Sequence, residues 1–195
     1  MKTNETKICV FAASSGRIDQ AYADDAYAVG TMLAQQGWQC VNGAGAMGLM
    51  RAVSDGALDA GGHVVGVIPK FMVDNGWCYD RLPELIITPD MHERKLQMTE
   101  MTQAVLALPG GCGTLEELLE AITWRQLGIS QRPIVLLNTR GYFDAMLAML
   151  QHCIDERFMK ASHQSLWTVA STPQQAVEAL ERELQQGPAS IESKY

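Results

Sequence analysis

The chain has 195 residues, of which 47% are hydrophobic, and its formal net charge at pH 7 is −7. This length supports one hydrophobic core and is too short for two full domains. The negative charge, with no basic stripe, argues against nucleic-acid binding, and no apolar run is long enough to cross a membrane. The polar residues 1–7 run directly into a predicted strand, so we expect no signal peptide.

The five cysteines are odd in number and scattered along the chain, which is typical of reduced thiols in a cytoplasmic protein rather than of a disulfide framework. No Cys-x-x-Cys or His-x-x-x-His spacing indicates a metal site. We therefore expect a cytoplasmic protein without a bound metal.

Apolar runs and helical periodicities alternate along the whole chain. In chain order, the first half predicts a strand at 8–12, a helix at 20–36, a strand at 38–41, a helix ending near 60 and a strand at 63–68. The second half predicts strands at 84–88, 104–108, 133–137 and 166–170, with helices at 91–102, 114–127, 142–157 and 173–186.

This alternation predicts a single Rossmann-like α/β domain over residues 1–186, with a doubly wound, mainly parallel sheet, followed by a polar tail at 187–195. Such sheets bind ligands beyond the carboxyl ends of their strands. Residues 70–83 show no clear period and contain Trp77 and Tyr79, so we expect a loop, or a lid over another part of the protein.

The stretch around the 104–108 strand has the strongest functional signal. Pro109 ends the strand, three glycines follow, and a helical pattern begins at Thr114. The glycines allow close approach of a ligand, and the first N–H groups of a helix are free to bind an anion such as phosphate. These glycines are Gly110, Gly111 and Gly113.

Two common phosphate loops do not fit this stretch. A Walker A loop requires a lysine that is absent after Gly113, and a dinucleotide fingerprint requires a small residue where Glu116 stands. Glu117 has two open interpretations. Thr114-x-x-Glu117 fits a capping box, whereas a carboxylate beside a phosphate site would also suit chemistry on a sugar.

A second glycine turn, Gly43-x-Gly45-x-x-Gly48, matches the dinucleotide pattern but lacks the acidic residue expected after the next strand. We therefore expect these glycines either to contact a phosphate or ribose or to serve only tight packing. The loop after the first strand contains Ser14, Ser15 and Arg17, which suit either a ligand contact or a serine turn and helix cap.

Arg94 precedes the central strand and has two open interpretations, a role beside Glu117 and a phosphate, or a place on a solvated charged face. His92 has no visible metal partner and is interpreted as structural. Several methionines, among them Met47 and Met50, are interpreted as core residues or as the lining of an apolar pocket.

Together these motifs resemble the LOG ("lonely guy") family of cytokinin riboside 5′-monophosphate phosphoribohydrolases, long labelled possible lysine decarboxylases. The resemblance covers residues 7–157. It rests on Pro-Gly-Gly-x-Gly-Thr-x-x-Glu at 109–117, Met-His-x-Arg-Lys at 91–95 and Gly-x-x-Gly-Leu-Met at 45–50. The chain departs from the family pattern at Ala12-Ala13, at Ala44 and at Arg51.

The resemblance implies hydrolysis of AMP or an N6-substituted AMP to free base and ribose 5-phosphate, without a cofactor, by a homodimer or larger homo-oligomer. It places the catalytic pair at Arg94 and Glu117. Glu84 and Glu116 are further possible site residues. It implies substrate or phosphate binding by Ser15, Gly45, Gly48, Met91, Lys95, Gly110, Gly111, Gly113 and Thr114.

Two alternatives to this function remain open. A pyridoxal-phosphate lysine decarboxylase would need a Schiff-base lysine, for which Lys70 and Lys95 are the candidates. A non-catalytic carrier of a nucleotide or cofactor could use the same sheet.

Overall fold

The computed structural model describes residues 6–186, and their strands form one seven-stranded, all-parallel sheet in the order β4-β3-β2-β1-β5-β6-β7. This confirms the predicted doubly wound α/β fold. The strands are β1 (Lys7–Phe11), β2 (Gln39–Asn42), β3 (Val64–Pro69), β4 (Glu84–Thr88), β5 (Ala104–Ala107), β6 (Ile134–Leu137) and β7 (Thr168–Ala170).

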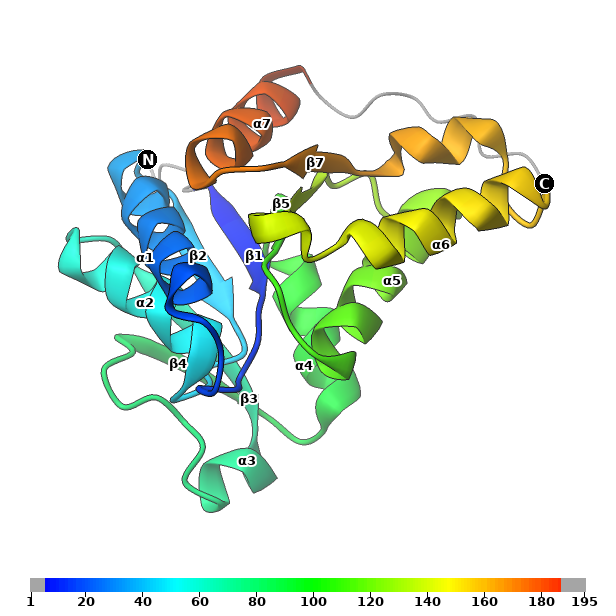
Figure 1. Ribbon diagram of the computed structural model, residues 1–195. Helices are drawn as coiled ribbons and strands as arrows, with labels where there is room; N and C mark the ends of the chain where they lie inside the picture. Colours follow the sequence, from blue (N-terminus) through cyan, green and yellow to red (C-terminus); the bar gives the residue numbers. More distant parts are fainter. Residues whose placement is uncertain (1–5, 187–195) are drawn as a thin grey trace.

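Helices cover both faces of the sheet, with α1, α2 and α7 on one face and α4, α5 and α6 on the other (Figure 1). Among the described residues, no helix is long and apolar enough to cross a membrane. The helices are α1 (Gln20–Gln35), α2 (Gly48–Asp59), α3 (Lys70–Asp74), α4 (Met91–Glu100), α5 (Cys112–Gln126), α6 (Asp144–Asp155) and α7 (Pro173–Gln186), with 3₁₀ turns η1 (Thr139–Gly141) and η2 (Ala161–Leu166).

Each face of the sheet has its own hydrophobic core. Leu33, Val53 and Leu180 pack against one face, and Leu118 and Ile122 pack against the other. Because the central strands are covered on both sides, they are apolar at nearly every position, which is why the sequence shows unbroken apolar runs there. Burial of a core leucine such as Leu33 or Leu118 stabilises the fold by about 1.5–3 kcal/mol.

Besides the start of α5, three element predictions were wrong in detail. The segment 70–83, expected to be a loop, begins with the short helix α3. The helix expected from Tyr142 begins at Asp144, because η1 precedes it. The strand expected from Leu166 begins at Thr168, because Leu166 is a fully buried residue of η2 and its apolar character serves the core rather than the sheet. The predicted tail at 187–195 lies outside the described residues.

The order of the strands places a topological switch at β1. From β1 the chain winds outward through β2 and β3 to β4, and then returns to the other side of β1 as β5. The connections that leave the carboxyl ends of β1 and β5 therefore diverge to opposite faces of the sheet. In an open α/β sheet, a crevice that binds ligands forms at this point.

Candidate functional site

A cavity of about 660 Å³ lies at the carboxyl ends of β1, β2, β3 and β5, which is a usual size for a small-molecule site. The loops after these strands supply its walls. Its lining residues are Ala12, Ala13, Ser14, Ser15, Gly43, Gly45, Ala46, Met47, Met50, Ile68, Met72, Gly76, Trp77, Met91, Arg94, Gly111, Cys112, Gly113, Thr114, Glu116 and Glu117.

Helix α5 begins earlier than the sequence indicated. Its N-cap is Gly111, which offers no side-chain cap, and the first bond within the helix runs from the N–H of Leu115 to the carbonyl of Gly111 (3.0 Å). The capping box of Thr114 and Glu117 is therefore wrong, because both residues lie inside the helix. The helix gives the N–H groups of residues 112–114 no partner, and these residues line the cavity, an arrangement that suits an anion.

The N-terminus of α2, in contrast, is already occupied by the protein. The carbonyl of Ala13 accepts from the N–H groups of Leu49 (2.8 Å) and Met50 (3.2 Å). Gly48 has a φ of +66°, and a Cβ there would lie 2.6 Å from the carbonyl oxygens of Ala13 and Ser15. Gly48 thus serves the close packing of the β1 loop. This leaves α5 as the helix whose first N–H groups are open to the cavity.

Arg94 is buried, with 5% of its surface exposed, so the interpretation as a solvated charged residue was wrong. Its Nε donates to the carbonyl of Val67 (3.1 Å) and its Nη2 to the carbonyl of Gly43 (3.3 Å). Its Nη1 contacts the sulfur atoms of Met91 (3.6 Å) and Met72 (3.9 Å). The guanidinium is therefore fixed by the main chain of β3 and of the turn after β2 and by two methionines, and Arg94 lines the cavity.

Gly43 makes this position of Arg94 available, because a Cβ at residue 43 would overlap the guanidinium. The second glycine turn therefore does not act as a dinucleotide fingerprint. Its first glycine accommodates the arginine, and its third, Gly48, accommodates the β1 loop.

Glu117 lines the same cavity as Arg94 and is half-buried. Burial raises the pKa of Glu117 to about 7, against the opposing effect of the Arg94 charge. Burial likewise lowers the pKa of Arg94, while Glu117 opposes the shift. Desolvation of Glu117 is a stronger effect on its pKa than the nearby positive charge of Arg94. Glu117 consequently changes its protonation state near neutral pH.

Lys95 points to the surface carboxylates rather than into the cavity. Its Nζ lies 2.5 Å from Glu116 and 3.2 Å from Glu120, so it neutralises two charges next to the site. Glu84 stands at the start of β4, at the opposite end of the strand from the cavity, where it pairs with His63 (2.9 Å). Glu84 is therefore not placed to act in this cavity.

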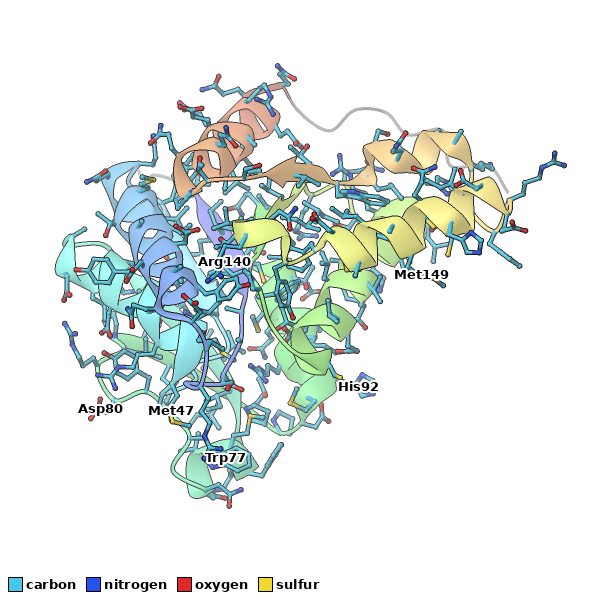
Figure 2. All side chains as sticks on the ribbon, in the orientation of Figure 1. Met47, Trp77, Asp80, His92, Arg140 and Met149 are labelled. Atoms are coloured by element: carbon cyan, nitrogen blue, oxygen red, sulfur yellow. The ribbon has the colours of Figure 1, made fainter. Side chains whose placement is uncertain are left out.

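The end of the cavity away from α5 is apolar and rich in methionine. The segment after α3 forms its wall, since Ala46 donates to the carbonyl of Trp77 (3.0 Å) and Tyr79 donates to that of Ala44 (2.9 Å). Met47 and Trp77 are 61% and 53% exposed, and Figure 2 shows both at the same end of the molecule. This segment is the wall that the sequence predicted as a loop or lid.

Most of the predicted site residues are brought together in the cavity. Those that line it are Ser15, Gly45, Met91, Arg94, Gly111, Gly113, Thr114, Glu116 and Glu117. Gly48, Gly110, Lys95 and Glu84 are not among the lining residues. Met72 and Cys112 also line the cavity but were not predicted, because they belong to no sequence motif and reach the site through the positions of α3 and α5.

Other features of the loops bear on the alternatives. Asp19, not a serine, caps α1, and Ser15 accepts from the N–H of Arg17 (3.3 Å) as a serine turn. Lys70, one of the two candidate Schiff-base lysines, is exposed and pairs with Asp74 (2.8 Å). Among the described residues, neither Lys70 nor Lys95 lines the cavity, and no group of three or more His, Cys, Asp or Glu could hold a metal ion.

The sequence of this chain has clear relatives. Residues 50–180 match the family model described as "Possible lysine decarboxylase". The chain is 39% identical over 181 residues to the cytokinin riboside 5′-monophosphate phosphoribohydrolase LOG5 of Arabidopsis thaliana, covering 93% of this chain and 79% of that protein. The chain belongs to the LOG family. A rice LOG-family protein, the probable phosphoribohydrolase LOGL6 of Oryza sativa subsp. japonica, is 40% identical over 175 residues, covering 90% and 70% of the two chains.

Solved structures with the same fold include a molybdenum cofactor binding protein from Rippkaea orientalis, at a TM-score of 0.71 and 22% identity over 93% of this chain and 98% of that one. The Moco carrier protein of Chlamydomonas reinhardtii has a TM-score of 0.72 and 22% identity over 94% and 99%. At this identity the likeness shows that the LOG family and these carriers share a fold.

Proposed function

We propose that this LOG-family protein hydrolyses the N-glycosidic bond of AMP or an N6-substituted AMP, a cytokinin riboside 5′-monophosphate, to free base and ribose 5-phosphate. The observation that carries this proposal is that Arg94 and Glu117 line one cavity together with the open N-terminus of α5. The names of the plant LOG relatives describe this reaction, and their identity of about 40% far exceeds that of the molybdenum cofactor carriers.

The 5′-phosphate binds at the start of α5. Gly111 and Gly113 line the cavity without side chains, and a phosphate oxygen can therefore approach the main-chain N–H groups of the first turn. Thr114, which is buried and also lines the cavity, offers a hydroxyl at the same place. The partial positive charge of the helix N-terminus favours the phosphate further.

The base then occupies the methionine-rich end of the cavity. Met47, Met50 and Met72 offer polarizable sulfur atoms, and Trp77 offers an aromatic face. Stacking on an aromatic side chain stabilises a bound base by about 1–3 kcal/mol. An apolar substituent on N6 of adenine would lie against the exposed Met47 and Trp77 at this end.

With the phosphate and base so placed, the ribose lies between them, next to the catalytic pair. The bond between C1′ and the base nitrogen breaks, its electron pair leaves with the base, and positive charge develops on the sugar. The ionised carboxylate of Glu117 stabilises this charge, and the oxygen of a water molecule adds at C1′. The water gives up a proton, and the departing base gains one.

Arg94 supports this step through its charge. Its guanidinium is held by carbonyl oxygens that do not neutralise it, so it favours the ionised form of Glu117 against the effect of burial. Since the pKa of Glu117 is about 7, the carboxylate is present at neutral pH and can also exchange a proton during turnover.

The proposal is tested by incubating the purified protein with AMP or N6-isopentenyl AMP and measuring free base and ribose 5-phosphate by chromatography. We expect release of base from both monophosphates and much slower release from adenosine, because the nucleoside lacks the group that α5 binds. Arg94→Ala and Glu117→Gln serve as inactive controls. Equal rates with adenosine and AMP would contradict the phosphate site, and no release from either monophosphate would contradict the activity.

We also propose that the protein is at least a homodimer in the cytoplasm. Leu96 of α4, Leu119 of α5, Leu127 just after α5 and Met149 of α6 are 40–60% exposed. These three helices cover the same face of the sheet, and Figure 2 shows Met149 pointing outward from α6. A second copy would cover this apolar surface.

The proposed location in the cytoplasm rests on the cysteines. All five are free thiols, which supports a reducing compartment. Alkylation of fewer than five thiols, in protein isolated without reductant and then denatured to expose the buried Cys9 and Cys40, would contradict that location.

A further inference from the structure

Tyr142 connects the loop before α5 to a distant part of the chain. It follows η1, 32 residues beyond the glycines, and its hydroxyl donates a hydrogen bond to the carbonyl oxygen of Gly110. The side chain of Tyr142 lies outside the set of cavity-lining residues. Any effect of this contact on a ligand must therefore pass through the main chain of Gly110.

The geometry of the peptide bond gives the contact a consequence for the cavity. In a trans peptide, the carbonyl of one residue and the N–H of the next point in opposite directions, and the protein contains no cis peptide in the described residues. Holding the Gly110 carbonyl toward Tyr142 therefore directs the N–H of Gly111 the other way. Gly111 lines the cavity, whereas Tyr142 does not, so an N–H turned away from Tyr142 is available to join the open N–H groups of α5.

The carbonyl of Pro109, which precedes Gly110, is also held by a hydrogen bond. The oxygen of Pro109 accepts from the N–H of Ala13 (3.1 Å), which is in the loop after β1. Without the Tyr142 hydroxyl, the peptide between Gly110 and Gly111 would have a glycine on each side and few barriers to rotation. Rotation of that peptide would turn a carbonyl oxygen toward the bound anion and repel it.

Several contacts hold Tyr142 itself in place. Arg140 pairs with Asp19 at the start of α1 (2.6 Å), and Thr139 donates to Asp25 (2.6 Å). The ring of Tyr142 meets the ring of Tyr22 edge-to-face at 6.0 Å. Figure 2 shows Arg140 between the η1 turn and α1. The hydroxyl is thus presented to Gly110 by a turn that is tied to α1.

We propose that Tyr142 is a positioning residue of the anion site, which orients the Gly110–Gly111 peptide so that its N–H serves the phosphate of the substrate. This inference rests on the proposed function for the identity of the substrate. The predicted effect on anion binding is independent of turnover.

The test is the variant Tyr142→Phe, which keeps the ring contact with Tyr22 and removes only the hydroxyl. Calorimetry with ribose 5-phosphate and with inorganic phosphate should show affinities about fivefold weaker than for the parent protein, as expected for one lost hydrogen bond. With AMP, KM should rise by a similar factor while kcat changes less than about twofold, because Arg94 and Glu117 are untouched. Affinity for adenosine should stay the same.

Tyr27→Phe is the matched control, since it also removes one hydroxyl, whose partner is Asp59 on α2 (3.2 Å). It should leave both anion affinities at the parental value. Unchanged anion affinity in Tyr142→Phe, with or without a lower melting temperature, would overturn the inference, and so would an equal loss of adenosine affinity. A parent protein that binds both anions but does not cleave AMP would overturn the proposed function and leave this inference intact.

Discussion

The guanidinium of Arg94 occupies the space that a side chain at position 43 would need. The Nη2 atom donates to the carbonyl of Gly43 itself, so the glycine both makes room for the arginine and binds it (3.3 Å). Gly43, which has no side chain, thereby controls the position of Arg94, a proposed catalytic group.

Gly43→Ala should therefore inactivate the enzyme through Arg94. Because the added methyl group displaces the guanidinium, we expect the rate of AMP cleavage to fall about a hundredfold, as is usual for a catalytic group misplaced by an ångström. Measurement of kcat/KM checks this. Gly16→Ala is the control, since a Cβ at residue 16 meets no atom within 4 Å, and it should keep the parental rate. A fully active Gly43→Ala protein would show that the position of Arg94 does not matter.

Glu117→Gln should stabilise the folded protein at alkaline pH. The folded-state pKa of Glu117 is raised from 4.5 to about 7, so the folded protein keeps a proton that the unfolded chain loses. Stability is therefore lost as the pH rises through this window, by about 3 kcal/mol once both states are ionised. Urea unfolding should show the variant more stable than the parent at about pH 8 and equal to it at about pH 4.

The same variant should lose activity by a factor of about a hundred or more, because glutamine carries no charge to stabilise a sugar cation. Stabilisation with full activity would leave Glu117 as a buried carboxyl with no part in catalysis. Loss of stability at alkaline pH would instead mean that its carboxylate is well solvated or paired in the folded protein.

The pH dependence of kcat/KM should follow the ionisation of Glu117. We expect activity on AMP to rise with pH through an apparent pKa near 7 and then to level off, because the carboxylate is the active form. Steady-state rates from acid to alkaline pH check this, with the melting temperature followed in parallel. Activity that falls as the pH rises through 7 would indicate that the protonated form of Glu117 acts on the leaving base.

Light scattering should give a mass of at least twice 21.4 kDa at micromolar concentration. Leu119→Glu places a charge on the exposed apolar surface of α5 and should shift the protein toward the monomer. A monomeric parent protein would contradict the proposed association.

Much of the fold could be predicted from the sequence, because strands such as β3 and β5 are buried on both faces and are therefore apolar throughout. The start of α5 could not. Thr114-x-x-Glu117 has the pattern of a capping box, yet the helix begins two residues earlier, because Gly113 accepts helical geometry and Leu115 bonds to Gly111 (3.0 Å). A local pattern of residue types does not reveal which of two adjacent turns forms the first turn of a helix.

Only the part of the candidate site that lies in short sequence motifs could be predicted. The glycines, Arg94 and Glu117 stand in short motifs around predicted strand ends. The burial that raises the pKa of Glu117, and the reach of Tyr142 to Gly110, depend on elements packed together from distant parts of the chain. Such contacts leave no periodic signal, so they required the three-dimensional structure.

Trp77→Ala should weaken binding of the base without affecting the phosphate. Trp77 is half exposed at the apolar end of the cavity, and its carbonyl is fixed by the N–H of Ala46 (3.0 Å), so the wall should survive loss of the ring. Loss of base stacking, at about 1–3 kcal/mol, predicts a KM for AMP raised roughly 5- to 150-fold. Affinity for ribose 5-phosphate should stay at the parental value. Trp77→Phe, which retains an aromatic face, should recover most of the loss in KM. Equal weakening of AMP and ribose 5-phosphate would mean that Trp77 supports the whole cavity rather than the base.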